Sequence, residues 1–123
     1  MSSPVLIVDD DDDLRASLAE FIKEEAGVDA LSAASLAQAR DLGRRVLDCR
    51  LAIVDINLGV GQPSGVDVLR WLRDTGFKAP VVFLTGHAKD HPLAVRAAQD
   101  ASVRILAKPM NVEVLLSLVS SAP

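Results

Sequence analysis

The chain contains a single cysteine, and this excludes two kinds of covalent or metal-based staple. With only Cys49 among 123 residues, the chain can form no internal disulfide, and it has no cluster of cysteines to hold a metal ion. We interpret Cys49 as a small, semi-buried residue that precedes a strand.

Blocks of lysine or arginine are also missing, and the formal net charge is −4. Neither the phosphates of a nucleic acid nor an anionic membrane surface is therefore an expected partner. No apolar run reaches the length of a bilayer span, and the first residues lead into a short apolar run instead of a signal peptide. We expect a cytoplasmic protein.

The residues that are present describe a globular chain. Half of them are hydrophobic and 24% are charged, which is enough apolar surface for one packed core. We expect one domain over residues 1–123, with a core from about 4 to 120.

Short apolar runs alternate with helical patterns. Uninterrupted runs predict buried strands at 5–8, 51–54 and 81–84, and runs that carry a charge predict weaker strands at 28–31 and 103–107. Capping and stop residues predict five helices: from the aspartates 11–13 to Gly27, from Ser35 to about Leu47, from Ser64 to Gly76, from Asp90 onward, and from Asn111 to about Ser120.

This alternation predicts an α/β fold, a doubly wound five-stranded parallel sheet of the (βα)5 flavodoxin-like type. The charges of Asp29 and Arg104 suit edge strands, so the second and fifth strands are placed at the edges. The order 2-1-3-4-5 meets this condition, and in that order ligands bind beyond the carboxyl ends of the first and third strands.

Polar side chains follow four of these strands. Asp9 and Asp10 follow the first and Asp55 the third, and carboxylates so close together repel one another unless a cation joins them. Oxygen ligands favour Mg²⁺. Thr85 and Lys108, after the fourth and fifth strands, add a hydroxyl and an ammonium group. The set predicts phosphoryl transfer to Asp55 and an aspartyl phosphate product.

Four segments in register resemble the receiver domain of two-component response regulators, a chemotaxis-receiver-like family: 5–10, 53–58, 83–86 and 106–109. The resemblance covers essentially the whole chain. It implies that a sensor histidine kinase or a histidine phosphotransfer protein passes a phosphoryl group to Asp55. It also implies that the chain is no enzyme toward other substrates and catalyses only its own phosphorylation and dephosphorylation.

The resemblance further implies roles for individual residues. Asp10, Asp55 and the backbone carbonyl of Asn57 would bind Mg²⁺ directly, and Asp9 would act through a water molecule. Lys108 would pair with the phosphoryl oxygens.

Thr85 would move its hydroxyl onto the phosphate and carry the signal to the fourth helix and fifth strand. Gly86 would leave room for the phosphoryl group. The family often has tyrosine or phenylalanine where this chain has Ile105, so the usual switch is predicted to be repacked or uncoupled.

The last predicted helix carries two apolar stripes. We expect the first to face the core and the second, together with Arg104 and the fourth helix, to form a partner or homodimer surface, with scattered surface aliphatics as the alternative. The core stripe is Val112, Leu115, Leu116 and Val119, and the second stripe is Val114 and Leu118.

Three other functions compete with the receiver interpretation. A phosphorylation-independent protein-binding module could use the same fold. A haloacid-dehalogenase-like phosphatase needs a second aspartate two residues after the nucleophile, where this chain has Asn57. A flavodoxin binds phosphate with a Ser/Thr-rich loop after the first strand, where this chain has aspartates that would repel it. The sequence identifies neither the kinase nor the output, and the chain is either a stand-alone or an excised receiver.

Overall fold

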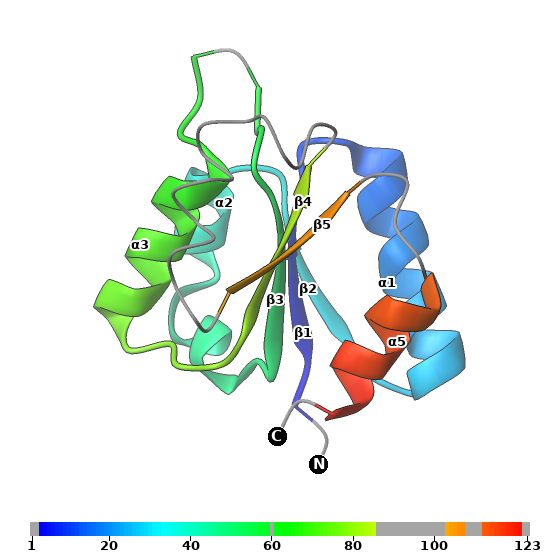
Figure 1. Cartoon of the computed structure of the whole chain (residues 1–123). Coiled ribbons are helices and arrows are strands. Elements are labelled where there is room, and N and C mark those ends of the chain that lie inside the picture. The colour runs from blue at the N-terminus through cyan, green and yellow to red at the C-terminus, as the bar shows by residue number, and fades with distance from the viewer. Residues whose placement is uncertain (1–2, 60, 86–102, 108–111, 122–123) are drawn as a thin grey trace.

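The computed structural model describes residues 3–59, 61–85, 103–107 and 112–121. Its core is a five-stranded parallel sheet in the order β2-β1-β3-β4-β5, with helices on both faces (Figure 1). The predicted topology is therefore confirmed. The elements are β1 (Val5–Val8), α1 (Asp12–Ala26), β2 (Ala30–Ala33), α2 (Leu36–Asp41), the 3₁₀ helix η1 (Gly43–Asp48), β3 (Leu51–Asp55), α3 (Gly65–Thr75), β4 (Val81–Thr85), β5 (Val103–Ala107) and α5 (Val112–Ser121).

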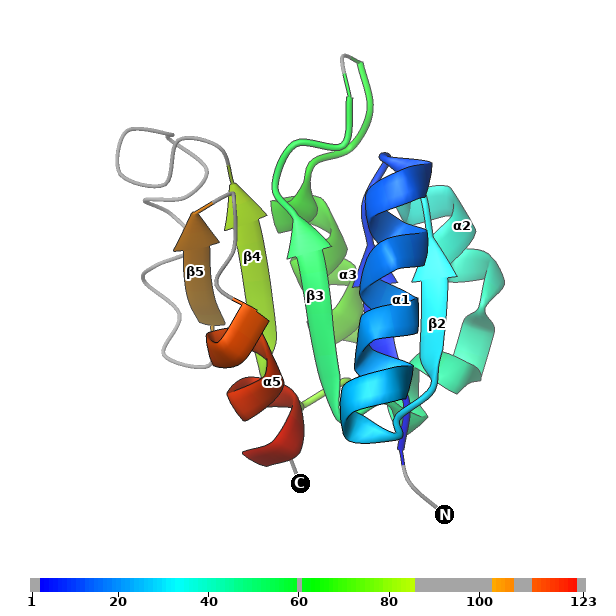
Figure 2. The same ribbon diagram turned by 90° about the vertical axis from the view of Figure 1, so that its right-hand side faces the viewer.

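The sheet separates two hydrophobic clusters. Successive side chains of a strand point to opposite faces, so Leu6 and Val8 of β1 join the cluster under α2 and α3, whereas Val5 and Ile7 join the cluster under α1 and α5. Figures 1 and 2 show these two helix pairs on opposite sides of the sheet. All four β1 side chains are fully buried, as their uninterrupted apolar run predicts.

Side-chain caps begin the helices as the sequence predicts. Asp11 accepts hydrogen bonds from the backbone N–H groups of Asp13 and Leu14 at the start of α1. Ser64 and Asp67 form a capping box at the start of α3. Both helices are thereby fixed at the end that lies near the carboxyl ends of the strands (Figure 2).

Two predicted elements were placed wrongly. Strand β2 covers Ala30–Ala33 and not 28–31, so Asp29 precedes the strand, where its carbonyl accepts a hydrogen bond from the Val5 N–H. The helix predicted from Ser35 to Leu47 is two pieces, α2 and η1. Gly43 has φ +61°, and this left-handed conformation interrupts an α-helix.

The apolar stripes of α5 differ from the prediction. Leu115 and Val119 are buried as expected, but Val112 is 45% exposed and lies outside the core. In the second stripe Val114 is 40% exposed, whereas Leu118 packs against the α1–α5 cluster. The fourth predicted helix and the cap at Asn111 fall outside the described residues.

Among the helices that the structure describes, none combines the length and the apolar character needed to span a lipid bilayer.

Candidate functional site

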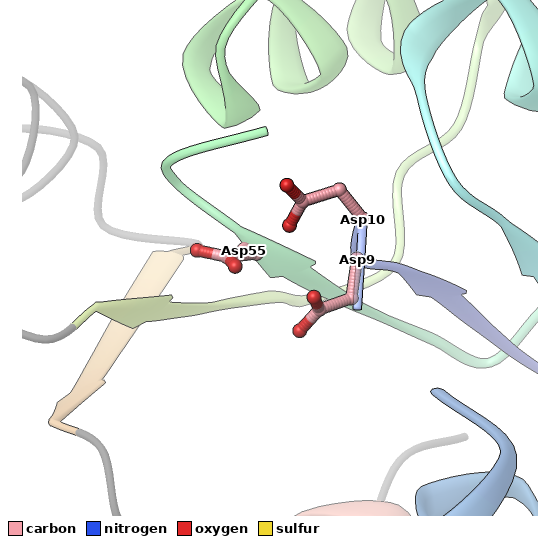
Figure 3. Close-up of side chains that lie close together, drawn as sticks. All are labelled: Asp9, Asp10 and Asp55. Atoms are coloured by element: carbon pink, nitrogen blue, oxygen red, sulfur yellow. The ribbon is translucent and has the colours of Figure 1, made fainter. Parts of the chain in front are cut away.

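The site lies where β1 and β3 end side by side. Val8 of β1 is the register partner of Val54 in β3, so the residues that follow them, Asp9 and Asp55, stand at the same edge of the sheet. Asp10 follows directly. One carboxylate oxygen from each of the three aspartates lies within 4.8 Å of the others, and Figure 3 shows the three side chains gathered at the ends of the two strands.

Two of the three carboxylates are buried, and a buried ionised carboxylate costs free energy unless hydrogen bonds or positive charges stabilise it. Asp9 is 1% exposed and Asp55 is 6% exposed, whereas Asp10 faces solvent. The backbone N–H of Asp11 donates to Asp9 Oδ1 at 2.9 Å, and the Arg15 guanidinium donates to the Asp9 carbonyl at 2.7 Å. Arg15 also pairs with the exposed Asp12 at 2.7 Å, so its positive charge lies beside the Asp9 backbone and is shared with Asp12.

The loop after β3 is hydrogen-bonded to the Asp55 carboxylate. The Asn57 N–H donates to Asp55 Oδ1 at 3.0 Å, and the Gly59 N–H in turn donates to Asn57 Oδ1 at 3.1 Å. Gly59 has φ +113°, and a Cβ placed on it would lie 3.7 Å from Asp10 Oδ2. The start of the loop therefore lies against both strand ends that form the cluster.

Gly65, the first residue of α3, lies against the backbone of Asp55 and was not singled out from the sequence. Its N–H donates to the Ile56 carbonyl at 2.8 Å, and a Cβ placed on it would lie 2.5 Å from the Asp55 carbonyl oxygen. The only local signal is a glycine that directly follows the helix cap Ser64. This close approach fixes the distance between α3 and the strand end that carries Asp55.

Thr85 is another predicted site residue within the described part. It is the last residue of β4, it is 4% exposed, and its register partner is Ala107 in β5. The Ile56 N–H donates to the Leu84 carbonyl at 3.0 Å, which ties the end of β4 to the residue after Asp55. The predicted residues Lys108 and Gly86 lie outside the described residues.

Ile105 occupies the position predicted for the missing aromatic switch. It pairs with Phe83 in the β4–β5 register and packs, partly buried, against the α2–α3 cluster. Arg104 beside it is exposed on the edge strand, as predicted.

The donor set fits a hard divalent cation. Three carboxylates within reach of one another offer oxygen ligands alone, and such a set is typical of Mg²⁺. The exposed Asp10 leaves the cluster open to solvent on one side. The two buried carboxylates therefore repel a small anionic group unless a cation lies between them and that group.

Comparison with known proteins places the chain in a family. The family model described as "Response regulator receiver domain" matches residues 5–120. The response regulator protein TodT of Pseudomonas putida is 31% identical over 122 residues, which cover 98% of this chain and 51% of TodT. The transcriptional regulatory protein FixJ of Azorhizobium caulinodans is 34% identical over 122 residues, which cover 98% of this chain and 55% of FixJ. The chain thus spans about half the length of these curated relatives.

Solved structures agree with this placement. The crystal structure of a response regulator receiver protein from Pseudomonas putida is 28% identical in sequence and has a TM-score of 0.83. The match covers 98% of this chain and 97% of that one. The chemotaxis protein CheY4 of Vibrio cholerae, at 22% identity and a TM-score of 0.79 with full coverage of both chains, shares the fold. The chain therefore belongs to the response regulator receiver domains of two-component signalling.

Proposed function

We propose that residues 1–123 act as a phosphoacceptor unit in which Asp55 receives a phosphoryl group. The observation that carries this proposal is the convergence of Asp9, Asp10 and Asp55 at one edge of the sheet, with oxygens within 4.8 Å. Two of the three carboxylates are buried, and a buried carboxylate beside others is poised for chemistry that involves a cation.

Mg²⁺ is the cofactor that these residues fit. Asp10, Asp55 and the backbone carbonyl of Asn57 would hold it, with Asp9 acting through a water molecule. When bound, the ion neutralises the carboxylates and the negative charge of the incoming phosphate.

The chemical step forms one bond and breaks another. A carboxylate oxygen of Asp55 attacks the phosphorus of a phosphohistidine, the P–N bond breaks, and the imidazole leaves with the electron pair. The hydrogen bond from the Asn57 N–H to Asp55 Oδ1 holds the carboxylate in one orientation for in-line attack. Lys108 would neutralise the phosphoryl oxygens, and the Thr85 hydroxyl would donate to one of them after transfer.

The test is intact mass after incubation with Mg²⁺ and acetyl phosphate. We expect the wild-type chain to gain the mass of one phosphoryl group, and Asp55→Asn to gain none. Asp10→Asn should slow the gain and raise the Mg²⁺ concentration that it needs, whereas Asp41→Asn, at the exposed end of α2, should leave both unchanged. Circular dichroism of each variant checks the fold.

An equal adduct on Asp55→Asn would show that another residue is phosphorylated. The absence of an adduct on the wild type, from both acetyl phosphate and a phosphorylated histidine kinase, would instead favour the phosphorylation-independent binding module.

The relatives suggest where the signal comes from and where it goes. Their names describe response regulators and transcriptional regulators about twice as long as this chain. We therefore propose a sensor histidine kinase or phosphotransfer protein as donor. The recipient is an output domain or a second copy that contacts the edge formed by β5 and α5. Phosphorylation that leaves amide chemical shifts in β5 unchanged would show that Ile105 has uncoupled the switch.

A further inference from the structure

A groove runs between α2, η1 and α3, on the face of the sheet away from α5. It consists of two hollows of about 410 and 380 Å³, which share Arg40 and Trp71 in their linings. Arg70 lines the first hollow, and Arg44 and Leu47 line the second. None of these residues belongs to the aspartate cluster.

Three arginines in this groove have no partner among the residues that the structure describes. The side chains of Arg40, Arg44 and Arg70 are exposed, and within the described part of the chain they form neither an ion pair nor a hydrogen bond. Other arginines are used differently. Arg50, for example, donates to the Ser3 carbonyl, and Arg73 donates to the carbonyls after α3.

Acidic residues only partly offset these arginines. Asp67 lines the first hollow, but its carboxylate accepts hydrogen bonds from Ser64 at the start of α3. Asp74 is the other acidic lining residue and is exposed. The lining thus carries three arginines and two aspartates, a net charge of +1 in a chain whose net charge is −4.

The groove also offers apolar surface between the arginines. Trp71 is partly buried and packs against the α2–α3 cluster, and Leu47 is 41% exposed. Arginine and tryptophan together dominate the centres of protein interfaces, because a guanidinium pairs with carboxylates while a ring covers apolar area.

We propose that this groove binds an acidic peptide segment of a partner protein. Carboxylates of the segment pair with Arg40, Arg44 and Arg70, and an interposed aliphatic side chain covers Trp71 and Leu47. The proposal is separate from the phosphoacceptor function, because no groove residue contributes to the aspartate cluster.

The single tryptophan makes the test direct. Trp71 is the only tryptophan and the chain has no tyrosine, so the intrinsic emission reports on this groove alone. The full chain is titrated with a short synthetic peptide that alternates glutamate and leucine. A matched peptide with lysine in place of glutamate is the control. We expect a saturable change in emission with the acidic peptide only, and an affinity that falls as salt is added.

Charge-matched variants locate the contact. Arg40→Gln combined with Arg70→Gln should weaken binding by about tenfold or more, since two charge-assisted contacts are lost. Lys23→Gln combined with Lys78→Gln removes the same charge elsewhere and should leave binding unchanged, as should Asp55→Asn. Thermal unfolding confirms that each variant is folded.

Several outcomes would overturn the proposal. One is equal binding of the lysine peptide, and another is an equal loss in both double variants. The proposal would also be overturned if the emission showed no saturable change with the acidic peptide. A concentration-dependent change in emission without any peptide, accompanied by dimers in sedimentation, would show that a second copy of the chain occupies the groove.

Discussion

Replacing Gly65 with alanine would place a methyl group against the backbone that carries Asp55. The added Cβ would lie 2.5 Å from the Asp55 carbonyl oxygen, 2.8 Å from Ile56 Cα and 3.1 Å from the Asp55 carbonyl carbon. None of these atoms is the end of a flexible side chain, so either β3 or the start of α3 must move. Forced packing of this kind costs about 1–3 kcal/mol, and the better helix propensity of alanine returns at most about 1 kcal/mol.

A matched glycine separates this steric cost from backbone strain. Gly61 has φ +78° but nothing within 4 Å of an added Cβ, so Gly61→Ala should cost only the left-handed penalty, about 1 kcal/mol. The φ of Gly65 is not positive, so strain alone would make Gly65→Ala the milder change. Contact with Asp55 makes it the more damaging one.

The assay is urea unfolding of both variants, followed by the initial rate of the mass gain from acetyl phosphate. We expect a net loss of about 2 kcal/mol for Gly65→Ala and a slower phosphoryl gain, because Asp55 is displaced. Wild-type stability and rate for Gly65→Ala, or a larger loss for Gly61→Ala, would refute the reasoning.

Three further predictions concern the core and the surface. Burial, with a smaller effect of Asp48, raises the pKa of the Cys49 thiol to about 11 from its ordinary 9.0. As pH rises, the unfolded chain therefore loses this proton before the folded chain does. The free energy of unfolding should fall by up to about 2–3 kcal/mol between about pH 9 and pH 11. Cys49→Ala should lack this pH-dependent loss of stability. Ile53→Ala in the centre of the sheet should cost about 2–5 kcal/mol in urea unfolding, and Ile53→Val only about 0.5–1.5 kcal/mol. The exposed Lys23–Asp29 pair, although its atoms are 2.7 Å apart, should contribute less than about 1 kcal/mol in a double-mutant cycle.

The sheet and the aspartate cluster follow from short-range patterns. The uninterrupted apolar runs at β1, β3 and β4 identify buried strands, and polar residues directly after them must stand at the carboxyl edge of a parallel sheet. The topology then brings Asp9 and Asp55 together, as found. The proximity of the three aspartates is observed, whereas the roles of all the site residues, Lys108 and Asn57 included, remain predictions.

The errors arise where tertiary contacts decide. Gly43 inside a helical pattern can be tolerated or can end the helix, and the pattern alone does not decide between the two; in the structure Gly43 is left-handed and begins η1. Helix α5 is apolar on most sides, so periodicity could not tell that Val112 is exposed while Leu118 packs on the core. The contact of Gly65 with Asp55 joins residues from two elements, and no local pattern encodes it.

The sheet acts as a partition between two sets of packing partners. Neighbouring residues of β5 belong to different sides, since Ile105 packs with the α2–α3 cluster and Leu106 with the α1–α5 cluster. Substitutions on opposite sides share no packing partners, so their effects on stability should add. A substitution that repacks one face is therefore expected to leave the packing of the other face, and the register of the strand ends, unchanged.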